Sequence, residues 1–173
     1  MKKYSILLLC IFFAIAASAQ NGFGFGVGMS TSKAPMVNVK YFFDKNAVSV
    51  GASYQVFNDA LGTRHDEFIP GSTGIDDGDY FYSFDVGYTR VISDNFSIAG
   101  ELSFATRKYF WNFSNENYSA SGYHWVHKTK SEFGGGAMVF YNLSEVFGFF
   151  AGYNTIREGT FGVEFRFLKD KQY

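Results

Sequence analysis

Strict alternation of apolar and polar residues near the C-terminus is the feature that most limits how this chain can fold. Across residues 159–167 the apolar positions are Phe161, Val163, Phe165 and Phe167, and the positions between them are Thr160, Gly162, Glu164 and Arg166. Successive side chains of a β-strand point to opposite faces, so a strand here has one apolar and one charged face. The pattern predicts a strand that separates two different environments.

The same alternation recurs along the chain and predicts eight strands. They span residues 22–30, 36–43, 47–57, 80–91, 96–106, 133–141, 146–153 and 159–167. Tight turns at 44–46, 93–95 and 142–145 alternate with long polar connections at 58–79 and 107–131. We expect the two arms of the 107–131 connection to extend their strands. The fold class predicted is all-β, an eight-stranded antiparallel up-and-down barrel with its long connections at one end.

The N-terminus has the three parts of a secretory signal peptide. Lys2 and Lys3 are followed by an apolar run at residues 6–17 and by the small-residue cleavage site Ala17-Ser18-Ala19. The apolar run is short for a membrane-spanning helix. We therefore predict a signal peptide at residues 1–19 and one domain at residues 20–173. Cys10, the single cysteine, lies in the signal peptide, so the exported fold would not depend on disulfides.

Composition favours a membrane barrel over other exported folds. Aromatic residues make up 21% of the chain, and no later segment approaches the ~20 apolar residues of a spanning helix. A chain without such helices can cross a membrane only as a closed barrel. The predicted strands carry aromatic residues toward both ends, as interfacial girdles do. The alternative is a soluble periplasmic barrel that binds an apolar ligand, with the Phe and Val faces turned inward.

The whole pattern resembles the small eight-stranded outer-membrane barrels, of the OmpX type and the OmpA transmembrane domain. Thr160, Gly162, Phe165 and Phe167 resemble the C-terminal signal that the outer-membrane assembly machinery recognises in such barrels, although residues 168–173 follow here. The resemblance implies location in the outer membrane of a Gram-negative bacterium. It also implies contact with outer-membrane lipid and lipopolysaccharide.

The inward faces of the predicted strands carry charged residues. They are Lys40, Asp85, Glu101, Glu132, Glu164 and Arg166. The lumen of an eight-stranded barrel is just wide enough for side chains to fill it, so these groups predict a polar network that plugs the barrel. Because an isolated buried charge is costly, we expect Arg166 to pair with Glu101 or Glu164.

An aromatic and basic segment near the expected external rim is a possible binding surface. Its residues are Arg107, Lys108, Tyr109 and Trp111, with Trp125 across the loop. They could hold lipopolysaccharide or an extracellular protein, or form part of the interfacial girdle. The formal net charge falls from −1 to −3 when Lys2 and Lys3 are removed, so no basic footprint for nucleic acid is expected.

No metal, cofactor or catalytic site is predicted. His124 and His127 are an odd number of residues apart and would face opposite sides of a strand. Asp76, Asp77 and Asp79 lack the spacing of a calcium loop, so we interpret them as solvated loop charges. The sequence predicts a non-enzymatic barrel with a structural or surface-interaction role. A lipid-modifying outer-membrane enzyme is the other alternative.

Overall fold

The computed structural model describes residues 21–115 and 119–168, and the elements it assigns there are all β-strands. Within these residues no helix is long and apolar enough to cross a membrane. The strands are β1 (Asn21–Ser30), β2 (Pro35–Phe43), β3 (Asn46–Tyr54), β4 (Thr63–His65), β5 (Thr73–Val91), β6 (Phe96–Asn115), β7 (Ser119–Asn142), β8 (Phe147–Asn154) and β9 (Glu158–Leu168). The predicted signal peptide at residues 1–19 lies outside the described residues.

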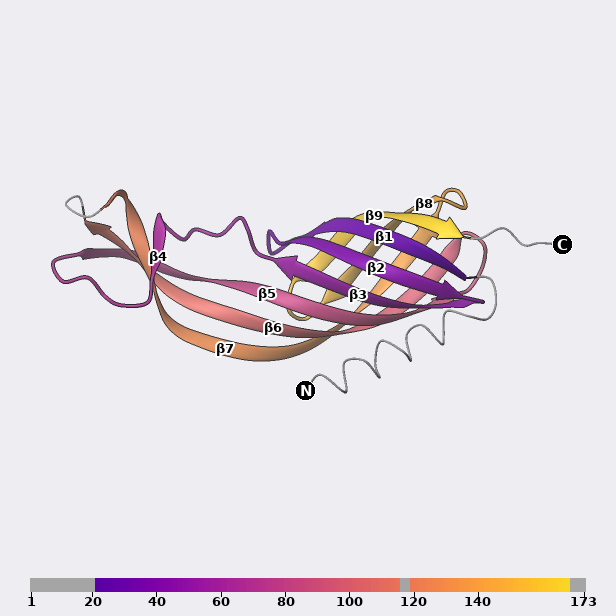
Figure 1. Ribbon diagram of the computed structural model, residues 1–173, viewed down its shortest axis with the longest axis horizontal. Coiled ribbons are helices and arrows are strands. Elements are labelled where there is room, and N and C mark those ends of the chain that lie inside the picture. The colour runs from indigo at the N-terminus through magenta and orange to yellow at the C-terminus, as the bar shows by residue number, and fades with distance from the viewer. Residues whose placement is uncertain (1–20, 116–118, 169–173) are drawn as a thin grey trace, which may run out of the picture.

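Eight of the strands close into an antiparallel up-and-down barrel (Figure 1). Each pairs with its neighbour in the chain, with β3 pairing directly to β5, and β9 pairs back to β1 over Gly22–Ser30. The short strand β4 is extra to the barrel and pairs in parallel with β7. The predicted fold class is confirmed.

The two faces of each barrel strand match the alternation of the sequence. In β2, Val37 and Val39 are exposed at 48% each, whereas Asn38 and Lys40 between them are buried at 6% and 2%. In β9, Phe165 is exposed while Glu164 and Arg166 are buried. The apolar side chains therefore point outward and the charged ones inward. This is the reverse of what a soluble carrier with an apolar lumen requires, so that alternative is wrong.

Turn lengths divide the barrel into two different ends. The β2–β3, β5–β6 and β7–β8 connections are short, and Asp44 takes a positive φ of 53° in the first of them. Aspartate tolerates this left-handed conformation better than most residues, which suits a tight turn. At the other end, the chain between β3 and β5 spans residues 55–72 and contains β4, whereas most of the predicted 107–131 connection belongs to β6 and β7.

Three strands project far beyond the barrel at the long-connection end (Figure 1). The strands β5, β6 and β7 have 19, 20 and 24 residues, against 8 to 11 for the other barrel strands. The expected extension of the 107–131 arms is confirmed. Residues 73–79, however, were predicted as loop and belong to β5, because their backbone pairs with β6 across a register shift between Gly74 and Asp77. We call these projecting parts, residues 73–81 of β5, 107–115 of β6 and 119–130 of β7, the extension.

Candidate functional site

The β3–β5 connection is bound to the extension rather than free in solvent. The Asn112 side chain accepts a hydrogen bond from the Leu61 amide at 2.9 Å and donates to the Asp59 carbonyl at 2.8 Å. Asn112 is buried at 1% exposure, so both bonds are shielded from water. A buried amide with satisfied donors and acceptors holds the loop in one position.

The same connection then passes around the edge of β7. Nδ1 of His124 lies 2.9 Å from the Leu61 carbonyl, and β4 pairs with Tyr123–Trp125 of β7. Further along, Trp125 Nε1 donates to the Asp66 carbonyl at 3.2 Å, and the Phe68 ring packs against Phe113 at 5.2 Å. The loop therefore covers part of a strand edge that would otherwise be open to pairing.

A cleft of about 440 Å³ lies where this loop meets the base of the extension. It is lined by Tyr54, Asn58, Ala60, Gly62, Arg64, Tyr80, Tyr82, Lys108 and His124. Tyr54 and Tyr82 are cross-strand partners at the end of β3. Lys108 pairs with Tyr80, which lies two residues beyond Tyr82 on β5. The outward apolar side chains form a band around the barrel, which we call the apolar belt. The cleft begins where this belt ends.

Two cations and three tyrosines give this cleft its chemistry. Nζ of Lys108 lies 5.9 Å from the Tyr80 ring centroid and 5.7 Å from that of Tyr82, within reach of cation–π attraction. Arg64 is exposed and contacts Asp66 at 2.5 Å. Burial raises the pKa of the Tyr80 phenol further above neutral, where the group is already a hydrogen-bond donor. Cationic, aromatic and hydroxyl groups together suit an anionic, hydroxyl-rich ligand.

The residues of the predicted external binding surface do not lie together in one site. Lys108 lines the cleft, whereas Arg107 is bound to Asp79 and, through Nε at 3.1 Å, to Glu132. Partial burial acts to raise the pKa of Glu132, but the hydrogen bond and charge of Arg107 outweigh it and hold that pKa below its ordinary value. The Arg107 charge is therefore already compensated.

The three aromatic residues of that surface lie away from the cleft lining. Tyr109 lies under Lys128, with Nζ 5.3 Å from its ring centroid. Trp111 and Trp125 flank His127 at 6.1 and 6.0 Å between ring centroids. Among residues 21–115 and 119–168, no group of three His, Cys, Asp or Glu side chains is placed to hold a metal ion.

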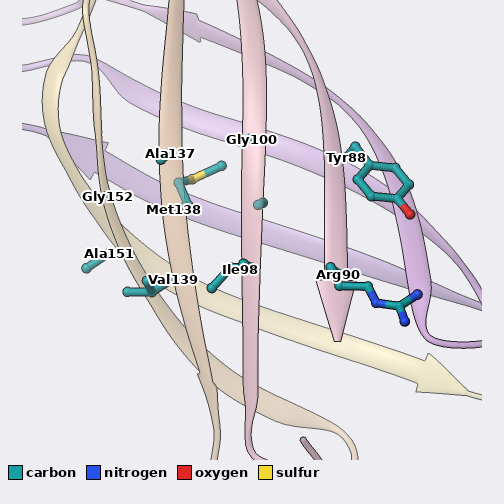
Figure 2. A pocket seen from close by; sticks show the side chains of 10 residues that line it. Tyr88, Arg90, Ile98, Gly100, Ala137, Met138, Val139, Ala151 and Gly152 are labelled. Atoms are coloured by element: carbon teal, nitrogen blue, oxygen red, sulfur yellow. The ribbon is translucent and has the colours of Figure 1, made fainter. Parts of the chain in front are cut away.

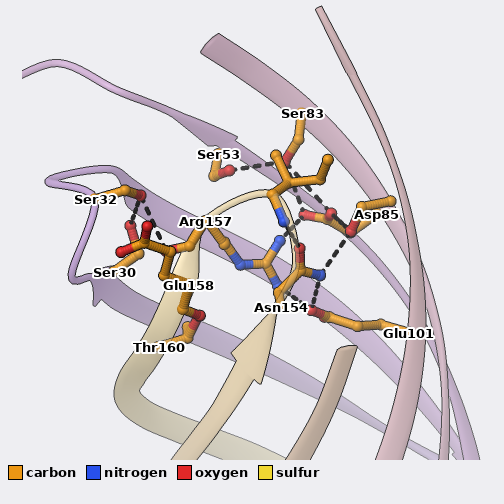
Figure 3. Close-up of polar contacts among 12 residues, drawn as sticks. Ser30, Ser32, Ser53, Ser83, Asp85, Glu101, Asn154, Arg157, Glu158 and Thr160 are labelled. Carbon is orange, nitrogen blue, oxygen red and sulfur yellow. Dashed lines mark hydrogen bonds and ion pairs between the residues drawn. The ribbon is translucent and has the colours of Figure 1, made fainter. Parts of the chain in front are cut away.

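Inside the barrel the charges form two clusters, and the first is centred on Arg157 (Figure 3). Arg157 NH1 lies 2.7 Å from Asp85 Oδ2, and NH2 donates to Glu101 Oε1 at 2.5 Å. Asn154 Nδ2 also donates to Glu101 at 2.5 Å, and Ser103 Oγ donates to Asp85 at 2.5 Å. Arg157 has no exposed surface, although it comes from the β8–β9 connection and not from a strand.

The second cluster joins β2 and β9. Lys40 Nζ forms an ion pair with Glu164, both almost fully buried, and also lies 3.4 Å from the Phe140 ring centroid. Arg166 donates from NH2 to the Ser144 carbonyl at 2.9 Å, at the short-turn end. The expected partners of Arg166 are thus bound elsewhere, Glu164 to Lys40 and Glu101 to Arg157. The predicted pairing of Arg166 was wrong, because Lys40 holds Glu164 and Arg157, which the prediction did not consider, holds Glu101.

A small cavity lies in the lumen between these clusters. It has a volume of about 10 Å³ and is lined by residues that include Asn38, Lys40, Asp85 and Glu101. That volume is about the minimum that a single water molecule needs. Glu132 lies further out, at the external mouth, where it also accepts a bond from Lys130 at 3.3 Å.

The C-terminal residues compared with an assembly signal lie on β9, which closes the barrel against β1. Thr160 is buried, while Phe165 and Phe167 face outward at 39% and 63% exposure. Gly162 lies opposite Gly28 of β1. Their recognition by the assembly machinery stays a prediction.

Comparison with known proteins shows which solved structures share this fold. No protein-family model matches the chain, and no curated protein matches it in sequence. Among solved structures, Ail, the attachment invasion locus protein of Yersinia pestis, superposes with a TM-score of 0.52 at 16% identity, over 87% of this chain and all of that one. The fold is that of the small outer-membrane β-barrels. Ail in complex with the heparin analogue sucrose octasulfate gives the same TM-score and identity, over 86% of this chain and 97% of that one.

Proposed function

We propose that this chain is an integral outer-membrane barrel, closed by its luminal side chains, whose external cleft binds anionic saccharides. The observation that carries the proposal is the convergence of Arg64 and Lys108 with Tyr54, Tyr80 and Tyr82 around one cleft. Its volume of about 440 Å³ falls within the range of about 300–1,000 Å³ usual for small-ligand sites. The role is binding, and no catalytic step is needed to explain the residues present.

The ligand class follows from the chemistry of the lining. Sulfate or phosphate groups would bind Lys108 and compete with Asp66 for the exposed Arg64, and tyrosine rings and hydroxyls provide stacking and hydrogen bonds for a sugar. The position of the cleft just beyond the apolar belt matches the level of lipid headgroups in the outer leaflet. Ail, which shares the fold, binds a sulfated sugar in its solved complex, and this supports the same class of ligand here.

Two sources could supply such a group, namely the phosphorylated sugars of lipopolysaccharide and a sulfated polysaccharide of another surface. Titrations with lipopolysaccharide and with sucrose octasulfate separate the two sources. Binding should weaken as salt is raised, because exposed charges are screened over about 10 Å at 0.1 M.

Replacing Lys108 with glutamine is expected to weaken binding of the preferred probe about tenfold, because one charged contact is lost. Arg64→Gln should have a similar effect, and the double variant should lose binding. Isothermal titration of the purified barrel in detergent measures this. Lys130→Gln is the matched control, since Lys130 is external but bonded to Glu132 and outside the cleft lining. Unchanged affinity in the double variant would show that the ligand does not bind in the cleft.

A further inference from the structure

The outward face of the barrel carries a hollow near the short-turn end (Figure 2). It has a volume of about 710 Å³, and its lining includes Tyr88, Arg90, Gly100, Ala137 and Ala151. The outward positions at its floor, Gly100, Ala137 and Ala151, have little or no side chain. Neighbouring outward positions are large, for example Leu102 at 75% and Tyr153 at 60% exposure. The hollow is therefore a local gap in an otherwise bulky apolar belt.

Packing within the protein does not explain the glycine at the centre of this gap. A Cβ atom added at Gly100 would meet nothing within 4 Å, and its φ is not in the left-handed region. Most other barrel glycines differ, since a Cβ at Gly24 would lie 2.8 Å from the Phe42 ring. Glycine weakens a strand, and in a strand interior it often marks a place where a ligand approaches the backbone.

The cationic side chain of Arg90 lies at the short-turn end of the hollow. Arg90 is an outward residue of β5, one position before the strand ends at Val91. Its NH1 donates to Asn46 Oδ1 at 2.8 Å, and the Tyr88 hydroxyl donates to the same oxygen at 2.5 Å. No carboxylate of the described residues lies within ion-pair distance of Arg90. An uncompensated guanidinium beside an apolar surface favours an anion.

We propose that this hollow is a binding site for one anionic phospholipid of the inner leaflet. An acyl chain lies over Gly100, Ala137 and Ala151, and the phosphate binds the Arg90 guanidinium. Charge complementarity selects this occupant over a second copy of the barrel packed symmetrically on the same face, which would set one Arg90 against another. The proposal rests on the lipid-facing belt and not on the external cleft, which lies at the opposite end of the barrel.

Native mass spectrometry of the detergent-purified full chain tests the site with two probes, phosphatidylglycerol and phosphatidylcholine of identical acyl chains. We expect one phosphatidylglycerol to be retained per barrel, with a preference of about fivefold over phosphatidylcholine. Arg90→Gln should remove the preference, and Arg90→Lys should retain most of it. Ala137→Leu fills the hollow and should reduce retention of both lipids.

Two matched variants control for general effects. Lys45→Gln removes a cation from a short turn without touching the hollow, and Ala52→Leu enlarges an outward alanine elsewhere on the barrel. Both should behave as the wild type, and heat-dependent gel mobility should show that every variant is folded. Equal retention of the two lipids, or an unchanged preference in Arg90→Gln, would overturn the proposal. So would barrel-to-barrel cross-links that Ala137→Leu abolishes without any lipid being retained.

Discussion

Replacing Arg157 with alanine is expected to destabilise the barrel by about 3–5 kcal/mol, because it leaves two buried carboxylates without their cation. Asp85 and Glu101 are only 5% and 7% exposed, and both contact the guanidinium. The measurement is the free energy of unfolding in urea, with the protein in detergent micelles.

The partners of Arg157 provide the internal test. Combining Arg157→Met with Asp85→Asn and Glu101→Gln removes all three charges and should recover most of the lost stability. Arg64→Ala is the matched control, because it breaks an exposed arginine pair worth at most about 1 kcal/mol. If Arg157→Ala changed stability no more than Arg64→Ala does, the luminal cluster would not be a structural element.

Placing arginine at Val86 is expected to cost about 2–4 kcal/mol in a lipid bilayer, because Val86 lies near the middle of the lipid-facing belt. Its neighbours across the sheet are Val50 and Leu102, and it is 50% exposed on the outward face. Stability is measured by urea unfolding of protein refolded into vesicles.

Ser131→Arg controls for the substitution itself. Ser131 faces outward beyond the Phe104–Phe133 pair and is exposed, so arginine there should change stability by less than about 0.5 kcal/mol. A surface in water would tolerate arginine equally well at both positions. Equal stability of the two variants would therefore contradict the assignment of the belt to lipid.

The barrel could be predicted because the environments on its two sides determine the polarity of alternate residues along each strand. Lipid on one side and a crowded lumen on the other impose the alternation seen at Val37, Asn38 and Val39. Residues 73–79 lie outside this constraint, since both faces of the extension meet water or loop. Their strand character comes from pairing with β6, which a polar sequence does not reveal.

The site residues were harder to predict because they depend on which chain segments meet. Arg157 lies in a short connection, and nothing in its neighbours in sequence indicates that it enters the lumen. Arg107 and Lys108 are adjacent in sequence, yet Asp79 and Glu132 compensate one of them while the other lines the cleft. Arg64 reaches the same cleft from the β3–β5 connection, which the sequence predicted only as a long polar connection.

Cysteine labelling of whole cells tests the orientation of the barrel most directly. The sequence contains no cysteine other than Cys10, so Thr129→Cys in the extension, Lys45→Cys in a short turn and Val86→Cys in the belt each report one environment. We expect a membrane-impermeant maleimide to label position 129 in intact cells, position 45 only after the outer membrane is permeabilised, and position 86 only after denaturation. Labelling of position 86 in native protein, or of position 45 in intact cells, would contradict a lipid-facing barrel with an external extension.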